Sequence, residues 1–216
     1  MTPEEFISKW AGVTLTERAA AQSHFIDLCH LLDVPTPTDA DHHGEWYAFE
    51  KNTDKDGGRK GFADVWYQNH FAWEYKRPNG DLEKALIQIR QYAGALGNPP
   101  LLVVSDIQRI RIVPQFTGYV TTPHEIAIAD LRDSRTRDRL RALWVNPAAL
   151  KPTLTREGVT LEAAKQFGQI ADRLQSKDRT DPHIVAHFLI RILFCLFSED
   201  IGLLPPKHFT QMLERF

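Results

Sequence analysis

Three charged side chains, Asp64, Glu74 and Lys76, have a spacing that could support metal-assisted hydrolysis. Glu74 and Lys76 are two residues apart, so they point to the same face if this aromatic stretch is a β-strand. A hairpin-like connection would bring Asp64 beside them. Two adjacent carboxylates repel each other, and a divalent cation such as Mg²⁺ relieves the repulsion by taking oxygen ligands, to which the Tyr75 carbonyl could add one. Lys76 would orient or deprotonate a water beside the metal, which is the apparatus of phosphodiester hydrolysis.

A surface salt bridge on an edge strand would explain the same three residues, because the pattern is short. Three features favour the chemical interpretation. The residues lie in stretches rich in aromatic and β-branched side chains, where unpaired charges are costly. A helical segment follows in which Gln88 and Tyr92 share one face, which could serve the site or simply pack on the sheet. Glu17 could also reach the site from the first long helix, or be a first-turn residue favoured by the helix dipole.

The elements that must position these residues follow from hydrophobic periodicity and turn residues. Strands are predicted at Trp46–Glu50, Phe62–Tyr67, Phe71–Tyr75, Leu101–Ser105 and Gln108–Val113, with a further candidate at Phe116–Val120. A hairpin loop is predicted at Lys51–Lys60, with Asp56-Gly57-Gly58 at its tip. Helices are predicted at Thr16–Leu32, Leu82–Leu96, Leu131–Trp144, Thr160–Gln175, Asp181–Phe197 and Pro206–Phe216.

This order of elements predicts an α/β fold, in which helices flank a mixed sheet and an all-α segment follows. Pro147 and Pro152 mark the junction. We therefore expect one domain over residues 1–150 and a helical segment over residues 151–216.

The composition is that of an ordinary folded protein: 216 residues, 43% hydrophobic and 25% charged, enough for one good core or two small ones. A formal charge of -2 does not by itself indicate a nucleic-acid binder, but it allows a local basic surface. Cys29 and Cys195 lie in apolar helical patterns and predict buried free thiols in a reducing cytosol. The apolar run Ile184–Phe197 contains His187 and Arg191 and predicts a buried helix too short to cross a bilayer. The N-terminus lacks the features of a targeting signal.

At this level of detail the sequence resembles a known family. Asp64, Glu74-x-Lys76 and Gln88-x-x-x-Tyr92 resemble the PD-(D/E)XK nuclease signature with a RecB-like QxxxY helix. Residues 14–113 are similar to the N-terminal nuclease domain of MmeI-like bifunctional restriction–modification enzymes. The matching stretches are Phe25-Ile26-Asp27, Gly61-Phe62-Ala63-Asp64, Glu74-Tyr75-Lys76, the Gln88-to-Tyr92 helix and Val103-Val104-Ser105-Asp106-Ile107-Gln108-Arg109.

The resemblance extends beyond that domain, since the run from Phe194 to Pro205 looks like the helical connector of the same enzymes. It implies a restriction-endonuclease-like sheet in residues 1–150 and the start of a connector in residues 151–216. One departure is Ala63, which stands where the signature has proline; that position shapes the backbone and supplies no ligand.

The resemblance also implies roles for individual residues. Asp64 and Glu74 would bind Mg²⁺, or Mn²⁺ in its place, and Lys76 would act on the attacking water. Gln88 and Tyr92 would position the DNA backbone or the catalytic groups.

Further residues are expected around this centre. Glu17 would be an auxiliary ligand, acting through a second metal or a water. Phosphate contacts are expected from the basic residues that flank the proposed site, namely Lys51, Lys55, Arg59, Lys60 and Arg77. A second basic run is either a solvated face or a DNA-backbone contact; it comprises Arg132, Arg135, Arg137, Arg139 and Arg141.

In such enzymes an adenine methyltransferase and a target-recognition domain follow the connector. The resemblance therefore implies the N-terminal part of a longer protein, with S-adenosylmethionine bound only in the downstream domain. The implied substrate is double-stranded DNA in a prokaryotic cytoplasm, with no membrane partner. An alternative is the same fold in a phage-defence methyltransferase, where it would dock DNA or a partner without cutting.

Overall fold

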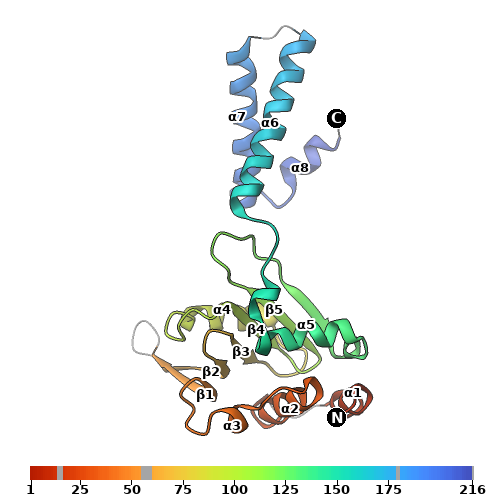
Figure 1. The fold of residues 1–216 in the computed structure, drawn as a ribbon. Helices are drawn as coiled ribbons and strands as arrows, with labels where there is room; N and C mark the ends of the chain where they lie inside the picture. Colours follow the sequence, from red (N-terminus) through yellow and green to blue (C-terminus); the bar gives the residue numbers. More distant parts are fainter. Residues whose placement is uncertain (14–16, 55–59, 179–180, 216) are drawn as a thin grey trace. The chain divides into compact units, whose positions relative to one another are not determined.

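The computed structural model describes residues 1–13, 17–54, 60–178 and 181–215, and it confirms an α/β fold with a six-stranded mixed sheet. The chain divides into two compact units, Met1–Thr155 and Arg156–Phe216, which are described separately (Figure 1). This division falls slightly beyond the junction that the two prolines predict near residue 150.

The sheet of the first unit has the strand order β1-β2-β3-β4-β5-β6. The strands are β1 (Tyr47–Asp54), β2 (Lys60–Tyr67), β3 (Phe71–Tyr75), β4 (Leu101–Ser105), β5 (Arg109–Pro114) and β6 (His124–Ala127). Neighbouring strands are antiparallel except β3 and β4, which are parallel. A parallel pair requires a crossover connection, and helix α4 (Leu82–Tyr92) provides it.

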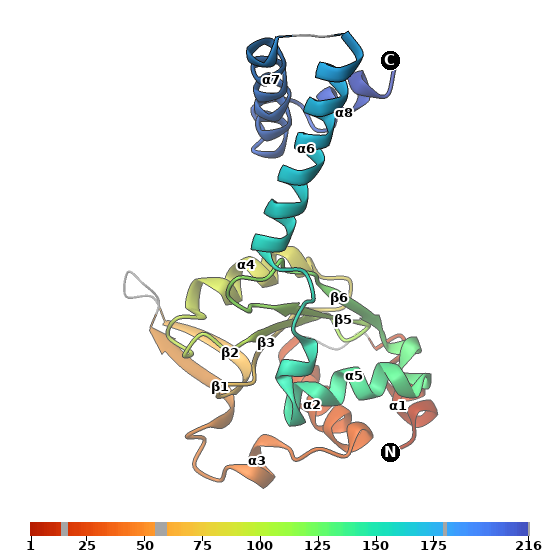
Figure 2. The ribbon, with the colours of Figure 1, turned by 45° about the horizontal axis from the view of Figure 1, so that its top comes forward.

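Helices cover both faces of this sheet (Figure 2). One face packs against α1 (Pro3–Trp10), α2 (Glu17–Leu32) and α5 (Ser134–Val145), and the other packs against α4. Shorter helical turns complete the unit: α3 (Pro37–Ala40) and two 3₁₀ turns, η1 (Ile128–Arg132) and η2 (Pro147–Leu150).

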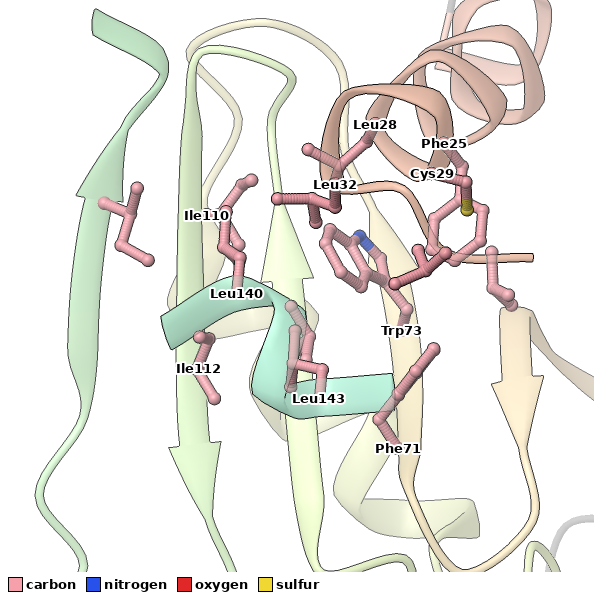
Figure 3. Close-up of a cluster of buried hydrophobic side chains, with 14 of the residues drawn as sticks. Phe25, Leu28, Cys29, Leu32, Phe71, Trp73, Ile110, Ile112, Leu140 and Leu143 are labelled. Carbon is pink, nitrogen blue, oxygen red and sulfur yellow. The ribbon is translucent and has the colours of Figure 1, made fainter. Parts of the chain in front are cut away.

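The larger core lies between the sheet and the helices α2 and α5 (Figure 3). Phe25 and Leu28 of α2 and Leu140 and Leu143 of α5 are fully buried, as is Trp73 of β3. The rings of Phe25 and Trp73 meet edge to face, with centroids 5.3 Å apart. This packing holds β3 at the centre of the sheet, where all five of its residues are buried.

Side-chain alternation along β3 divides it between two environments. Phe71, Trp73 and Tyr75 belong to the core under α2 and α5, whereas Ala72 belongs to the smaller core under α4. Glu74 therefore faces α4, as its hydrogen bonds with that helix show.

Several predicted elements differ from the observed ones. The strand predicted at Phe116–Val120 is wrong, because this segment contributes only an isolated bridge from Tyr119 to Thr155; the sixth strand is β6. The hairpin loop predicted from Lys51 is also too long, since β1 continues to Asp54. Helix α4 ends at Tyr92 rather than Leu96.

Helix α1 has no counterpart among the predicted elements, although its signal is present in the sequence. The Thr2 side chain accepts a hydrogen bond from the Glu5 N–H, and the Glu5 carboxylate accepts one from the Thr2 N–H. This reciprocal pair is a capping box, and Pro3 at the first helical position reinforces it.

The second unit is helical and consists of α6 (Arg156–Asp178), α7 (Pro182–Asp200) and α8 (His208–Leu213). The prediction that Ile184–Phe197 is buried is wrong in this chain, because Ile184, Phe188, Leu193 and Phe194 are each more than half exposed. The helix that contains this run, α7, is longer than the run itself, and by length and composition alone it is sufficient to cross a membrane, as core helices of soluble proteins also are. Both cysteines are free thiols, but only Cys29 is buried.

Replacement of Phe25 by alanine is expected to lower the free energy of unfolding of the first unit by about 3–5 kcal/mol, because a large buried ring is lost. Ile87→Ala, on the exposed side of α4, should change it by less than about 0.5 kcal/mol. All five tryptophans lie before residue 150, so urea unfolding followed by tryptophan fluorescence reports on this unit. Equal losses in the two variants would contradict the described core.

Candidate active site

The candidate site forms where β2 and β3 separate. Their last paired residues are Val65 and Trp73, and the next residues along the two strands are Asp64 and Glu74. The Asp64 carboxylate accepts a hydrogen bond of 2.6 Å from the Tyr75 N–H. A side chain thus replaces the backbone ladder at this point, which fixes Asp64 beside β3.

Glu74 is almost completely enclosed, with 4% of its surface exposed. Its Oε1 accepts hydrogen bonds from Lys76 Nζ at 2.8 Å and from Gln88 Nε2, and its Oε2 accepts one from the Tyr92 hydroxyl at 3.1 Å. Lys76 Nζ also donates to Gln88 Oε1 at 3.1 Å. The two-residue spacing on β3 and the four-residue spacing on α4 therefore bring these four side chains into one network.

The pKa values in this network are shifted because the Glu74 carboxylate is buried away from water. Burial, and after it the nearby negative charge of Asp64, raise the pKa of Glu74 to about 7, although the hydrogen bonds from Lys76 and Tyr92 and the charge of Lys76 act in the opposite direction. Burial also raises the pKa of Tyr92, with a contribution from Glu74, so this phenol remains a donor.

On the opposite side of Asp64 lies a small hollow of about 20 Å³ beneath α2. Gln22 of α2, Glu50 of β1, Asp64 and Tyr75 contribute to its lining. Glu50 stands opposite Asp64, because the flanking pairs are Phe49 with Val65 and Lys51 with Ala63. Its φ of 49° is in the left-handed region, which is uncommon for a residue other than glycine.

The sequence interpretation did not include Gln22 or Glu50. Glu50 could have been found from hairpin register, because in an antiparallel pair the residue opposite Asp64 follows from any one correct pairing. Gln22 is exposed on α2, next to the buried Ala21, and borders the hollow from there; the apolar pattern of the helix gives no signal for this position.

The ring of Tyr75 anchors β3 from the opposite face. His24 Nδ1 and the Tyr75 hydroxyl are 2.8 Å apart, and both side chains are fully or almost fully buried. Burial lowers the pKa of His24 to about 3, so the imidazole is neutral at physiological pH. Phe6 and Trp10 of α1 enclose it, with ring centroids 5.2 Å and 5.0 Å away. Through Tyr75, α1 and α2 support the backbone N–H that holds Asp64.

The expected phosphate-binding residues are placed unequally. Lys51 Nζ donates to the carbonyl of Gly44 at 3.0 Å and lies 4.5 Å from the Trp66 ring centre, so its charge already serves the β1 hairpin. Arg77 is exposed directly after Lys76. The remaining expected residues, Lys55 and Arg59, lie outside the described residues, as do the side chains of Lys60 and Glu17.

The donor set suits a hard divalent cation. Asp64 and Glu74 offer carboxylate oxygens, and burial first and the charge of Asp64 second disfavour the ionised form of Glu74, which a bound cation would favour. Within the described part of the chain, no three His, Cys, Asp or Glu side chains gather closely enough to hold a metal ion. Such a site would depend on two carboxylates and water, which is how proteins commonly bind Mg²⁺.

Comparison with known proteins identifies the family. Residues 1–177 match the family described as MmeI, N-terminal domain, and residues 183–216 match the MmeI helicase spacer domain. The chain therefore belongs to the MmeI family, whose members are restriction–modification enzymes that act on DNA. No curated protein and no solved structure matches the chain.

The raised pKa of Glu74 predicts a pH dependence of stability for the metal-free protein. Between about pH 4.5 and 7 the folded state binds more protons at Glu74 than the unfolded state does, so the free energy of unfolding falls as pH rises. At 1.36 kcal/mol per pH unit, the loss is on the order of 2–3 kcal/mol.

The measurement is urea unfolding by tryptophan fluorescence with EDTA at pH 5 and pH 7.5. Glu74→Gln keeps a hydrogen-bond acceptor but cannot ionise, so it should lose less stability than the wild type over this interval. Identical pH dependence in both proteins would show that Glu74 is not the group responsible.

Proposed function

We propose that this chain is the DNA-cleaving region of a restriction–modification enzyme, with a PD-(D/E)XK centre that hydrolyses phosphodiester bonds of double-stranded DNA. The observation that carries the proposal is the meeting of Asp64, Glu74 and Lys76 where β2 and β3 part. A buried carboxylate, Glu74, held beside the half-buried carboxylate of Asp64 is costly to maintain for stability alone. Membership of the MmeI family supports a substrate of DNA.

The proposed mechanism assigns a task to each residue. Asp64 and Glu74 would hold Mg²⁺, or Mn²⁺ in its place, with the Tyr75 carbonyl as a further ligand. When bound, the ion would supply positive charge to the reacting phosphodiester. Lys76, donating to Glu74 at 2.8 Å, would orient the attacking water and take part in its deprotonation. The water oxygen would bond to phosphorus while the P–O3′ bond breaks, leaving a 5′-phosphate.

Gln88 and Tyr92 would act through Glu74. They donate to its two oxygens from α4, so they set the direction of the carboxylate. Glu17 remains an auxiliary ligand in this proposal, and Lys51, Lys55, Arg59, Lys60 and Arg77 remain candidate contacts to DNA phosphates.

The wider setting is also a proposal. We infer a prokaryotic cytoplasmic enzyme in which a downstream methyltransferase domain binds S-adenosylmethionine and a target-recognition domain selects the DNA sequence. The competing candidate is a domain that docks DNA or a partner without cutting. A metal-binding measurement separates the two.

Asp64→Asn is expected to weaken Mn²⁺ binding at least tenfold, because a charged ligand becomes a neutral amide. Asparagine keeps the oxygen that accepts the Tyr75 N–H, so the fold should be preserved. Asp33→Asn is the matched control, since Asp33 is exposed after α2 and has a φ of 51°, which asparagine tolerates. Calorimetry on the chain measures both variants.

Lys76→Ala, tested in the protein that carries the recognition domain, should reduce Mg²⁺-dependent DNA cleavage by about 10²–10⁴-fold. Asp33→Asn should cleave at the wild-type rate. Cleavage that persists in Lys76→Ala would overturn the catalytic assignment, and a folded chain that binds no metal at millimolar concentration would favour the docking candidate.

A further inference from the structure

A second polar pocket lies in the first unit, away from the centre around Asp64. Its volume is about 290 Å³, and its polar lining consists of Thr122, His124, Arg139, Lys151 and Thr153. These residues come from β6, α5 and the segments beside them. The pocket is lined by three groups that carry or can carry positive charge and by no carboxylate.

Sheet register separates this pocket from Glu74. His124 is opposite Ile112, which is opposite Val103, which is opposite Trp73. Directly opposed residues share a face, so His124 lies on the face covered by α2 and α5, whereas Glu74 faces α4. Three strand spacings separate β6 from β3, or about 14 Å at roughly 4.8 Å each.

The basic groups of the pocket are available to a ligand. Arg139 is exposed, and within the described residues its guanidinium has neither a hydrogen bond nor an ion pair with a carboxylate. Lys151 is exposed, and its Nζ lies 4.2 Å from the centre of the Tyr119 ring; unlike Lys51, its ammonium makes no hydrogen bond or ion pair among the described residues. The neighbouring acid, Glu125, points to the other face of β6 and is bound to Arg111.

The structure also shows that the positive groups repel one another. Partial burial lowers the pKa of His124, and the charge of Arg139 lowers it further. An anion placed between them would reverse that effect. The groups facing His124 from the packed elements are Arg139 of α5 and Lys151 after η2.

We propose that this pocket binds a phosphate group. Arg139 offers the planar fork of donors that pairs with phosphate oxygens, Lys151 adds a point charge, and the hydroxyls of Thr122 and Thr153 can donate hydrogen bonds. The volume of the pocket is close to the lower end of the range for small-molecule sites, about 300 to 1,000 Å³, and leaves ample room for a phosphate group. That phosphate belongs either to a DNA backbone or to a free phosphate compound.

The test follows the imidazole signals of the nine histidines by NMR during a pH titration, with His124→Gln identifying the signal of His124. Inorganic phosphate, against chloride at equal ionic strength, should raise the pKa of His124 by about half a pH unit, which corresponds to threefold tighter binding to the charged imidazole. Arg139→Gln should abolish this response. Arg135→Gln is the matched control, because Arg135 is exposed one turn earlier on α5 and does not line the pocket.

A second titration with a short DNA duplex separates the two sources. If the backbone is the occupant, DNA also raises the pKa of His124, and Arg139→Gln alone lowers the salt dependence of DNA binding by about one counterion. A response to inorganic phosphate only assigns the pocket to a free phosphate compound. The proposal is overturned if neither probe moves the pKa of His124, or if both arginine variants respond alike. None of these outcomes depends on Asp64, Glu74 or metal binding.

Discussion

The burial of one carboxylate, that of Glu74, constrains the arrangement of the first unit. A carboxylate removed from water must find hydrogen-bond donors within the protein, and Glu74 finds three of them on two elements. Lys76 comes from the end of β3, whereas Gln88 and Tyr92 come from α4. The orientation of α4 on the sheet is thereby tied to the direction of the Glu74 side chain. Hydrophobic packing of α4 alone would allow the helix to rotate or slide, and these polar contacts remove that freedom.

The other side of β3 is buried in an apolar core, where side chains pack closely and few polar groups need partners. There Trp73 and Tyr75 are enclosed by aromatic side chains, and the only polar contact of the Tyr75 ring among the described residues is with a neutral imidazole. This apolar side is rigid because it is close-packed. It holds the Tyr75 backbone, whose N–H binds Asp64. One strand thus joins a packed core, which supplies stability, to a buried carboxylate whose ionised form is disfavoured by burial and by the charge of Asp64 and is favoured by its hydrogen bonds with Lys76 and Tyr92.

The central part of this arrangement was predictable from sequence because it depends on local spacing. Two residues along a strand place Glu74 and Lys76 together, and four along a helix place Gln88 and Tyr92 together; both periods hold whatever the rest of the chain does. The position of Glu50 depends instead on the register of the β1–β2 hairpin: one correct pairing places it opposite Asp64, but a loop predicted to begin at Lys51 leaves that pairing undefined. The strand predicted at Phe116–Val120 is wrong for a related reason. The sixth strand, β6, forms through its pairing with β5, and its own apolar pattern does not identify it. Apolar periodicity likewise predicts that α7 has a face to bury, but not which partner covers it.

The arginine run of α5 shows why composition could not decide between a solvated face and a phosphate contact. Arg137 donates to the carbonyls of Leu131 and Arg132, so its charge is used to close the turn before the helix. Arg141 lies 4.0 Å from the carboxylate of Asp33, at the end of α2. Arg139 instead lines a hollow shared with His124. Identical side chains at nearly regular spacing therefore have different neighbours, because successive positions on a helix face different directions. The net charge of -2 is a sum over 26 basic and 28 acidic residues and does not show where they lie. Acidic groups meet at the candidate centre and basic groups line the pocket beside β6, so a near-neutral protein can still present a local basic surface.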